Sequence, residues 1–324
     1  MISFTCNICG TPIAIEEVPW EQPTCTGCGS NVRMRALIYL LSLELFGTAR
    51  FLRDFPQNKQ VRGFGLSDAL LYATPLAEKV DYTNTFYDRQ PYLDITEEHP
   101  DQYGTYDFIL SSDVFEHVAP PIDRALEESF RLLKPNGFLC ITVPSTHVTD
   151  ETVEYYPDLH QYSIVELGGE HVLINRKKDK TLEICGNLEF HGGIGATLVM
   201  RLFSLADLKR RVQAAGFAEV FMQTDSVDQY GIFFPGPWSL PLIARKEPFE
   251  KLAVALPRPE QEPVPRAEKL SASNTNIDTR IAHLHAEKAA LERRVGTLEN
   301  QMRLAAESRW LRLGRTLGFG PRLD

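Results

Sequence analysis

The alternation of apolar and polar positions between Tyr106 and Pro144 predicts a strand, a helix and a second strand. Residues 108–110 form a short apolar run, and apolar side chains then recur at helical spacing until a Lys-Pro-Asn-Gly sequence ends the helix. The helical positions are Leu126, Phe130 and Leu133. Residues 138–143 supply the second apolar strand. This order predicts one parallel crossover of an α/β sheet.

The loop after the first of these strands is crowded with polar and ionisable side chains. They are Ser111, Ser112, Asp113, Glu116 and His117. Because open α/β sheets bind their ligands beyond the carboxyl ends of the strands, this loop predicts a ligand site. Many nucleotide-binding sheets share such a loop, so the pattern by itself does not identify a function.

Similar patterns predict the rest of the sheet and a helix before it. Apolar side chains recur at helical spacing over residues 32–46, and three segments with polar ends read as the first three strands. Two further segments near the end of the sheet read as an antiparallel pair. The three strands are residues 60–68, 80–88 and 92–96, and the pair lies around residues 217–223 and 238–246.

The amino-acid composition and the pattern of apolar residues change after residue 247. Residues 248–276 are rich in proline and read as a semi-extended linker. Residues 277–307 carry a heptad pattern, with Ile281 and Val295 at a positions and leucines at d positions, which predicts self-association through residues 277–305 as a parallel dimer. The alternative is a single amphipathic helix that folds back on the body.

The last segment, residues 308–324, places Trp310 and leucines on one helical face with arginines largely opposite. This pattern predicts an interfacial contact with a membrane surface. The alternative is a helix that docks onto its own oligomer.

Composition describes an ordinary globular chain of 324 residues with 43% hydrophobic residues and a formal net charge of -9. No run approaches the roughly 18 apolar residues of a membrane span, and no secretory signal precedes the first cysteines. The predicted location is therefore cytoplasmic, with peripheral attachment at the inner face of the membrane. Residues 266–324 hold 11 Lys and Arg against 7 Asp and Glu, which leaves 23 against 36 in residues 1–265. The acidic body argues against a large nucleic-acid footprint.

Four cysteines form two Cys-x-x-Cys-Gly motifs near the N-terminus. They are Cys6, Cys9, Cys25 and Cys28. Two such pairs at this spacing predict a Zn²⁺ site with four Cys ligands, which leaves no open coordination position and is therefore structural. Two disulfides are the alternative, although nothing indicates an oxidising compartment. The remaining cysteines, Cys140 and Cys185, read as free thiols.

Several motifs in sequence order resemble class I S-adenosylmethionine-dependent methyltransferases. They are the Gly-Leu-Ser-Asp sequence at 65–68, residues 82–88, the Leu-Asp-Ile-Thr sequence at 93–96, the Ser-Ser-Asp loop and the Leu-Leu-Lys-Pro-Asn-Gly strand entry. The resemblance covers roughly residues 1–247 and is to bacterial members that carry an N-terminal zinc ribbon. It implies an α/β, Rossmann-like sheet of seven strands with a zinc ribbon before it and a coiled-coil helix after it.

The resemblance divides the chain into five parts. A zinc ribbon spans residues 1–32, and a methyltransferase domain spans residues 33–247 with an acceptor-side insertion at 145–201. The linker, the coiled coil and the basic amphipathic tail follow, as residues 248–276, 277–307 and 308–324.

The resemblance also implies a set of residues that bind S-adenosylmethionine. They are Gly63, Phe64, Gly65, Ser67, Asp68, Asn84, Thr85, Asp94, Ile95, Ser111, Ser112 and Asp113. Members of the family commonly show an acidic residue and three glycines at the first strand, whereas this chain lacks the leading acid and has Ser67 in the third glycine's place. Asp68 or a backbone carbonyl is then expected to meet the cofactor's ammonium group.

The acceptor-side insertion, residues 145–201, is rich in His, Tyr and acidic residues. Imidazole titrates near neutral pH, so His191, His160 and His117 are candidate bases, with His191 preferred. Glu189 is a further candidate catalytic residue. Glu189 and Arg201 are expected to orient a polar acceptor. His117 is expected to hold its loop by hydrogen bonding.

The predicted function is S-adenosylmethionine-dependent methyl transfer to a hydroxyl of a sugar or glycan, because the aromatic and His-rich insertion suits a polyhydroxyl acceptor. The coil and basic tail resemble the C-termini of enzymes of bacterial surface-polysaccharide assembly. One alternative is an RNA methyltransferase that uses the ribbon to bind its substrate. The other is a non-catalytic scaffold with an altered cofactor loop.

Overall fold

A computed structural model describes residues 1–192, 197–234, 236 and 239–248. The predicted coiled coil, the basic tail and all of the linker except residue 248 lie outside the described residues. None of the described helices is long and apolar enough to cross a membrane.

The centre of the fold is a mixed six-stranded sheet in the order β15-β16-β6-β5-β3-β4. Its strands β3, β4, β5 and β6 are parallel, whereas β16 runs antiparallel to both β6 and β15. The bounds are β3 Asn58–Leu66, β4 Val80–Thr85, β5 Tyr106–Ser112, β6 Leu133–Thr142, β15 Glu219–Met222 and β16 Leu242–Arg245. The predicted α/β class, the parallel crossover and the closing antiparallel pair are confirmed.

The expected seventh strand, residues 92–96, is not a strand of this sheet. The segment makes a single parallel bridge, between Phe86 and Tyr92, and then turns away. The turn forms because the Asp94 side chain accepts hydrogen bonds from the backbone N–H and the hydroxyl of Thr96, at 2.9 and 2.7 Å. A carboxylate that captures the next backbone donors competes with the strand ladder.

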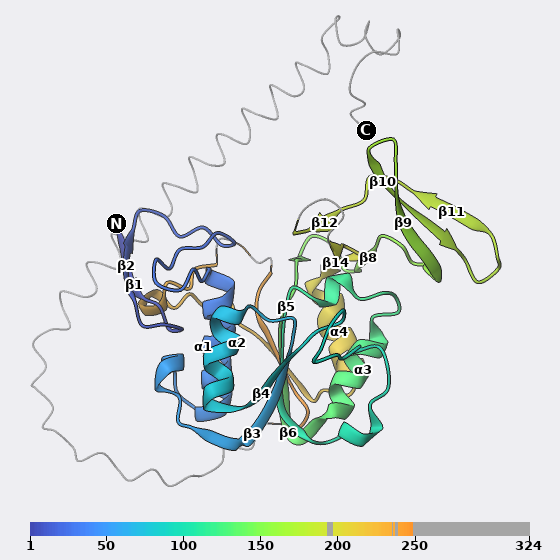
Figure 1. The fold of residues 1–324 in the computed structure, drawn as a ribbon. Helices are drawn as coiled ribbons and strands as arrows, with labels where there is room; N and C mark the ends of the chain where they lie inside the picture. Colours follow the sequence, from blue (N-terminus) through green and yellow to red (C-terminus); the bar gives the residue numbers. More distant parts are fainter. Residues whose placement is uncertain (193–196, 235, 237–238, 249–324) are drawn as a thin grey trace, which may run out of the picture. The chain divides into compact units, whose positions relative to one another are not determined.

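Helices cover both faces of the sheet (Figure 1). Helices α1 (Val32–Phe46) and α2 (Leu70–Lys79) share a buried cluster with side chains of one face, including Phe108 and Leu110. Helices α3 (Asp123–Leu132) and α4 (Leu205–Ala214) share another cluster with the opposite face, which includes Ile109. Successive residues of β5 thus enter different cores, because side chains alternate along a strand.

The N-terminal segment packs into the first of these clusters. Its hairpin, β1 (Ile2–Thr5) and β2 (Pro12–Ile15), contributes Phe4 and Ile13 to the core beneath α1. The N-terminal hairpin and the sheet are therefore covered by the same helix.

Short strands follow the central crossover. Strand β14 lies between β7 and β8, and β9, β10 and β11 form an antiparallel sheet of their own, while β12 pairs with β13. The bounds are β7 Ser145–Thr146, β8 Val153–Glu154, β9 Gln161–Leu167, β10 Glu170–Arg176, β11 Leu182–Cys185, β12 Phe190–His191, β13 Thr197–Leu198 and β14 Arg201–Ser204.

The two glycines of β3 allow large side chains to lie across the sheet. A Cβ atom at Gly63 would overlap the Phe108 ring, and one at Gly65 would overlap the Tyr82 hydroxyl and the Asp68 carboxylate. The packing of these rings therefore requires glycine at both positions.

We predict that Gly65→Ala lowers the free energy of unfolding by about 1–3 kcal/mol, because the added methyl group overpacks a filled site. Gly186→Ala is the matched control, since a Cβ there meets no atom within 4 Å. Urea unfolding of both variants measures the difference. Equal stabilities for the two variants would contradict this packing role.

Candidate active site

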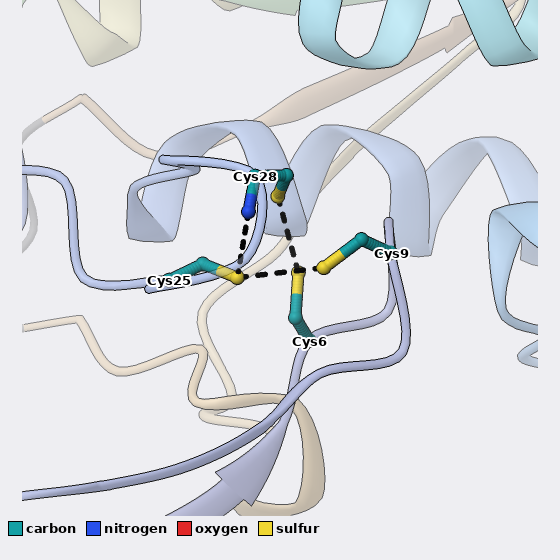
Figure 2. Close-up of side chains that lie close together, drawn as sticks. All are labelled: Cys6, Cys9, Cys25 and Cys28. Carbon is teal, nitrogen blue, oxygen red and sulfur yellow. Dashed lines mark hydrogen bonds between the residues drawn. The ribbon is translucent and has the colours of Figure 1, made fainter.

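The four N-terminal cysteines come together as one cluster (Figure 2). The sulfur atoms of Cys6 and Cys28 lie 3.8 Å apart, and those of Cys9 and Cys25 lie 3.5 Å apart. A tetrahedral Zn²⁺ ion with bonds of about 2.3 Å separates its sulfur ligands by about 3.8 Å. All six cysteines of the chain are free, so the disulfide alternative is not what the structure shows. The cluster is consistent with a zinc site.

Two tight turns position these sulfur atoms. The backbone N–H of Gly10 donates to Cys6 O, and that of Gly29 donates to Cys25 O, each at 2.8 Å. Both glycines adopt positive φ angles, 79° and 77°, which other residues rarely adopt. The glycine after each cysteine pair is therefore required by the turn.

The buried guanidinium of Arg35 joins the cysteine cluster to the body. It donates to Thr24 Oγ1 at 2.9 Å and Ser30 O at 3.0 Å, and to Gly231 O at 2.9 Å. Burial lowers the pKa of Arg35, while the neighbouring Cys side chains raise it. A buried cation beside thiolates offsets the negative charge of a four-cysteine zinc site.

The carboxyl ends of β3, β4 and β5 lie at one edge of the sheet, where the sequence predicts the ligand site. The connection after β3 leads to β4 on one side, and the connection after β5 leads to β6 on the other side, so the two connections run in opposite directions at this point. Open α/β sheets bind ligands at such a switch point. Ser67 and Asp113, just beyond β3 and β5, both adopt positive φ angles, 56° and 53°.

Asp68 is buried, with 4% of its surface exposed. Its carboxylate accepts hydrogen bonds from the hydroxyls of Tyr72, at 2.8 Å, and Tyr82. Burial raises the pKa of Asp68 to about 6, although both hydroxyls favour the charged form. The carboxylate is thus held by the two tyrosine hydroxyls, and its expected contact with the cofactor's ammonium group stays a prediction.

Other predicted cofactor residues brace the same loop. The Asn84 side chain accepts from Asp68 N and donates to Asp68 O, both at 2.8 Å, and Thr85 Oγ1 donates to Gly65 O at 2.8 Å. The side chains expected near the ribose therefore hold the end of β3. Phe64 and Ile95 are buried in the core, and Asp94 lies half-buried in its own turn.

Arg33 of α1 reaches the loop after β5. Its guanidinium donates to Ser112 Oγ and forms an ion pair with Asp113 at 3.0 Å. Ser112 Oγ also lies 3.1 Å from Thr142 Oγ1, whereas the buried Ser111 Oγ has no hydrogen-bond partner among the described residues. Burial raises the pKa of Asp113 to about 7, and the charge of Arg33 opposes that rise.

Arg33 was not among the residues predicted from the sequence. A signal was present, because Arg33 and Arg35 interrupt an otherwise apolar stretch of helix. Charged residues on the apolar face of a helix indicate buried ion pairs or hydrogen bonds.

Glu116, His117 and His191 gather at the end of this loop, and we refer to them as the Glu-His-His group. Glu116 Oε1 lies 3.6 Å from His117 Nε2 and 3.5 Å from His191 Nδ1, and the two ring nitrogens lie 3.1 Å apart. The exposed fractions of the side chains are 0% for Glu116, 12% for His117 and 39% for His191. The group is thus buried at the carboxylate and open at His191.

The two histidines differ in their electrostatic surroundings. Burial lowers the pKa of His117, whose Nδ1 lies 2.8 Å from Leu198 O. The carboxylate of Glu116 raises the pKa of His191. The expectation that His117 holds its loop agrees with its contact with Leu198, but its other ring nitrogen faces His191.

Arg201 stabilises the loop from the side of β14. Its buried guanidinium donates to Phe115 O at 2.6 Å and to Glu154 at 2.8 Å, and Met200 N donates to Glu116 O at 2.8 Å. Arg201 has no exposed surface. It was expected to orient the acceptor, and the structure corrects this, because a fully buried side chain cannot meet one.

The other two candidate catalytic residues lie outside the Glu-His-His group. His160 is exposed just before β9, and its backbone N–H donates to Asn175 at 3.0 Å. Within the described part of the chain, no hydrogen bond or ion pair joins its ring to the group. Glu189 is exposed near His191 and contributes to raising its pKa.

A protein-family model described as a methyltransferase domain matches residues 26–220, more than half of the chain. The chain belongs to this methyltransferase family. It is an S-adenosylmethionine-dependent methyltransferase. The scaffold alternative is thereby overturned. A search of curated proteins found none that matches the sequence of this methyltransferase.

Solved structures of methyltransferases resemble this one at low sequence identity. An S-adenosylmethionine-dependent methyltransferase from Mesorhizobium loti is 11% identical, with a TM-score of 0.38 over 60% of this chain and 95% of that one. A possible histamine N-methyltransferase from Thermotoga maritima is 16% identical, with a TM-score of 0.33 over 67% and 92%. A sugar N-methyltransferase from Streptoalloteichus is 12% identical, with a TM-score of 0.37 over 64% and 85%.

We predict that Cys25→Ser removes one equivalent of zinc from the purified methyltransferase and lowers the free energy of unfolding by more than about 3 kcal/mol, because binding of a structural ion contributes directly to folding. Cys185→Ser is the control, since this free thiol lies outside the cluster. Elemental analysis and urea unfolding measure both effects. Full zinc retention in Cys25→Ser would contradict the assignment.

We also predict a pH-dependent stability difference between the wild type and Asp68→Asn. The pKa of Asp68 is 3.8 in its ordinary setting and about 6 in the folded chain, so ionisation inside the fold is unfavourable. The contribution of Asp68 to stability is therefore lost as the pH rises from about 4 through about 6. Relative to Asp68→Asn, the wild type should lose about 3 kcal/mol over this range. Urea unfolding at several pH values measures the difference, and a constant difference would contradict the prediction.

Proposed function

We propose that this enzyme transfers the methyl group to a hydroxyl of a sugar or glycan. The observation that carries the proposal is the Glu-His-His group, which follows the cofactor-side loop of β5 directly. An alcohol must lose its proton when it is methylated, so it needs a group that promotes proton loss beside the cofactor. His191, the most exposed member of the group, is the residue proposed to face the acceptor.

Exposed aromatic rings on the acceptor-side insertion and beyond β4 support a carbohydrate acceptor. The backbone N–H of Tyr155 donates to Met200 O, and the backbone N–H of Met200 donates to Glu116 O. Met200 therefore links the backbone of Tyr155 to that of Glu116. The Tyr155 side chain is 38% exposed. Tyr87 and Tyr92, beyond the end of β4, are also exposed, and their ring centroids lie 6.5 Å apart. Such rings combine an apolar face with a polar hydroxyl, which suits stacking against a sugar.

The residues at the switch point fit S-adenosylmethionine through charge. When bound, the cofactor supplies an electrophilic methyl group on a positively charged sulfur. Its amino-acid end carries one carboxylate and one ammonium group, and the ion pair of Arg33 with Asp113 offers one charge of each sign at the carboxyl end of β5. We propose that Arg33 binds the carboxylate and Asp113 the ammonium group, since opposite charges at short range favour each other.

The RNA alternative gains no support from the ribbon. Residues 1–32 contain three Glu and no Lys or Arg, whereas binding to a phosphate backbone needs clustered cations. The ribbon instead contributes to the folding of the first core, as its buried Phe4 and Ile13 indicate.

The acceptor class can be tested with labelled S-adenosylmethionine and a panel of sugars, oligosaccharides, amines and RNA. The proposal predicts transfer to a saccharide hydroxyl, as an ether that survives alkali, and no transfer to the corresponding deoxy sugar. Transfer to an amine or to RNA, with none to saccharides, would contradict it.

We predict that Arg33→Ala weakens binding of S-adenosylhomocysteine by roughly 10- to 100-fold, because a charge-assisted contact with the carboxylate is lost. Methylthioadenosine lacks the amino-acid end, so both proteins should bind it equally. Arg210→Ala is the surface control, because Arg210 is 54% exposed and pairs with Glu151 and Asp207. Titration calorimetry measures all of these affinities. An equal loss of affinity for both ligands would show that Arg33 supports the fold alone.

A further inference from the structure

The carboxylate of Glu116 is buried without a hydrogen-bond donor. Neither of its oxygen atoms has a hydrogen-bond partner among the described residues, and none of its side chain is exposed. A buried carboxylate without donors is unfavourable by several kcal/mol unless a cation compensates it. Among the described residues, the cation-forming groups that lie within 4 Å of it are His117 and His191, at 3.6 and 3.5 Å. These distances exceed the 2.7–3.2 Å of an ordinary N–H···O hydrogen bond.

The proton on His117 is placed by its contact with Leu198. A carbonyl oxygen only accepts hydrogen bonds, so Nδ1, 2.8 Å from Leu198 O, carries the ring proton of the neutral imidazole. The lone pair of Nε2 then points towards His191 Nδ1 and Glu116. A hydrogen bond from one ring nitrogen to a carbonyl is the arrangement that commonly orients a metal-binding histidine.

The three facing atoms form a nearly equilateral triangle. Its sides are 3.1 Å between the two ring nitrogens, and 3.5 and 3.6 Å from those nitrogens to the carboxylate oxygen. A point equidistant from three atoms at these separations lies about 2 Å from each, which matches the Zn–N and Zn–O distances of protein sites. The geometry suits an ion better than a chain of hydrogen bonds, since the chain would leave Glu116 without a donor.

We propose that Glu116, His117 Nε2 and His191 Nδ1 bind a divalent metal ion of the Zn²⁺ type, separate from the four-cysteine site. Two imidazoles and one carboxylate are a donor set that zinc and similar transition metals accept. Three protein ligands on one side of the ion leave a coordination position open, whereas four cysteines leave none. An open position is the property of a catalytic site.

The catalytic part of this inference rests on the proposed function. The acceptor hydroxyl would occupy the open position, where the positive ion lowers the hydroxyl pKa. The O–H bond breaks and the proton passes to solvent water on the exposed side of His191. The oxygen electron pair then forms the new bond to the methyl carbon, and the C–S electron pair stays on sulfur. His191 would hold the ion in this arrangement instead of taking the proton itself.

Metal binding can be measured without cofactor or acceptor. The full chain is dialysed against micromolar Zn²⁺, and bound zinc is determined by elemental analysis. The wild type is expected to hold two equivalents, while His191→Ala and Glu116→Gln each hold one. His160→Ala is the matched control and is expected to hold two, because its ring lies outside the group. Cys25→Ser should lose the other equivalent and keep the one at the Glu-His-His group.

Substitution with Co²⁺ provides a second measurement on the same proteins. The four-cysteine site gives intense sulfur-to-cobalt absorption, whereas a site of nitrogen and oxygen donors gives weak visible bands. The weak bands should be present in the wild type and absent in His191→Ala. Because Glu116 is fully buried, circular dichroism and binding of S-adenosylhomocysteine verify that both variants fold.

The outcomes separate this inference from the proposed function. The metal site at the Glu-His-His group would be overturned if the wild type bound one zinc equivalent. It would also be overturned if His191→Ala and Glu116→Gln each still bound two. Zinc binding as expected, without methylation of any alcohol, would contradict the proposed acceptor while the metal site stands. If both hold, His191→Ala should lower the turnover number by at least about 100-fold with unchanged affinity for S-adenosylhomocysteine.

Discussion

The loop after β5 is held between two arginines, and the active site depends on this constraint. Arg33 of α1 pairs with Asp113 on one side, and Arg201 of β14 donates to the carbonyl of Phe115 on the other. Each arginine is 80 or more residues away in sequence from the loop residue that it contacts. The loop can therefore carry one residue with a positive φ angle, Asp113, and the buried carboxylate of Glu116, because its neighbours determine its conformation.

The same constraint gives the N-terminal cysteine cluster a role in the site. Helix α1 begins directly after the second cysteine pair, and its first turns carry Arg33 and Arg35. Arg35 joins the cluster to the body, and Arg33 points to the cofactor loop. A structural ion at the cysteines would therefore fix the start of α1 and, through it, the charge of Arg33 that we propose binds S-adenosylmethionine. The ribbon needs no contact with the acceptor to influence activity.

Local sequence patterns predicted the elements well, because periodicity and helix stops act over a few residues. The helix at 32–46 and the crossover around the Ser-Ser-Asp loop are examples. The strand expected at 92–96 failed because one side chain, Asp94, captures the following donors. The contacts of Arg33 with Asp113 and of His117 with His191 join distant positions, and no local pattern indicates such pairs. The sequence places Glu116 in the polar loop, but only the folded chain shows that its carboxylate is buried without a hydrogen-bond donor.

The central claim is that the cofactor lies at the switch point beside a metal-binding Glu-His-His group. The most direct measurement is a crystal structure of the full chain with S-adenosylhomocysteine and Zn²⁺, with anomalous data at the zinc edge. We predict two anomalous peaks, one among the four cysteines and one equidistant from Glu116, His117 and His191, with the ligand's carboxylate on Arg33. A peak at the cysteines alone, or a ligand bound away from the ends of β3 and β5, would contradict the account.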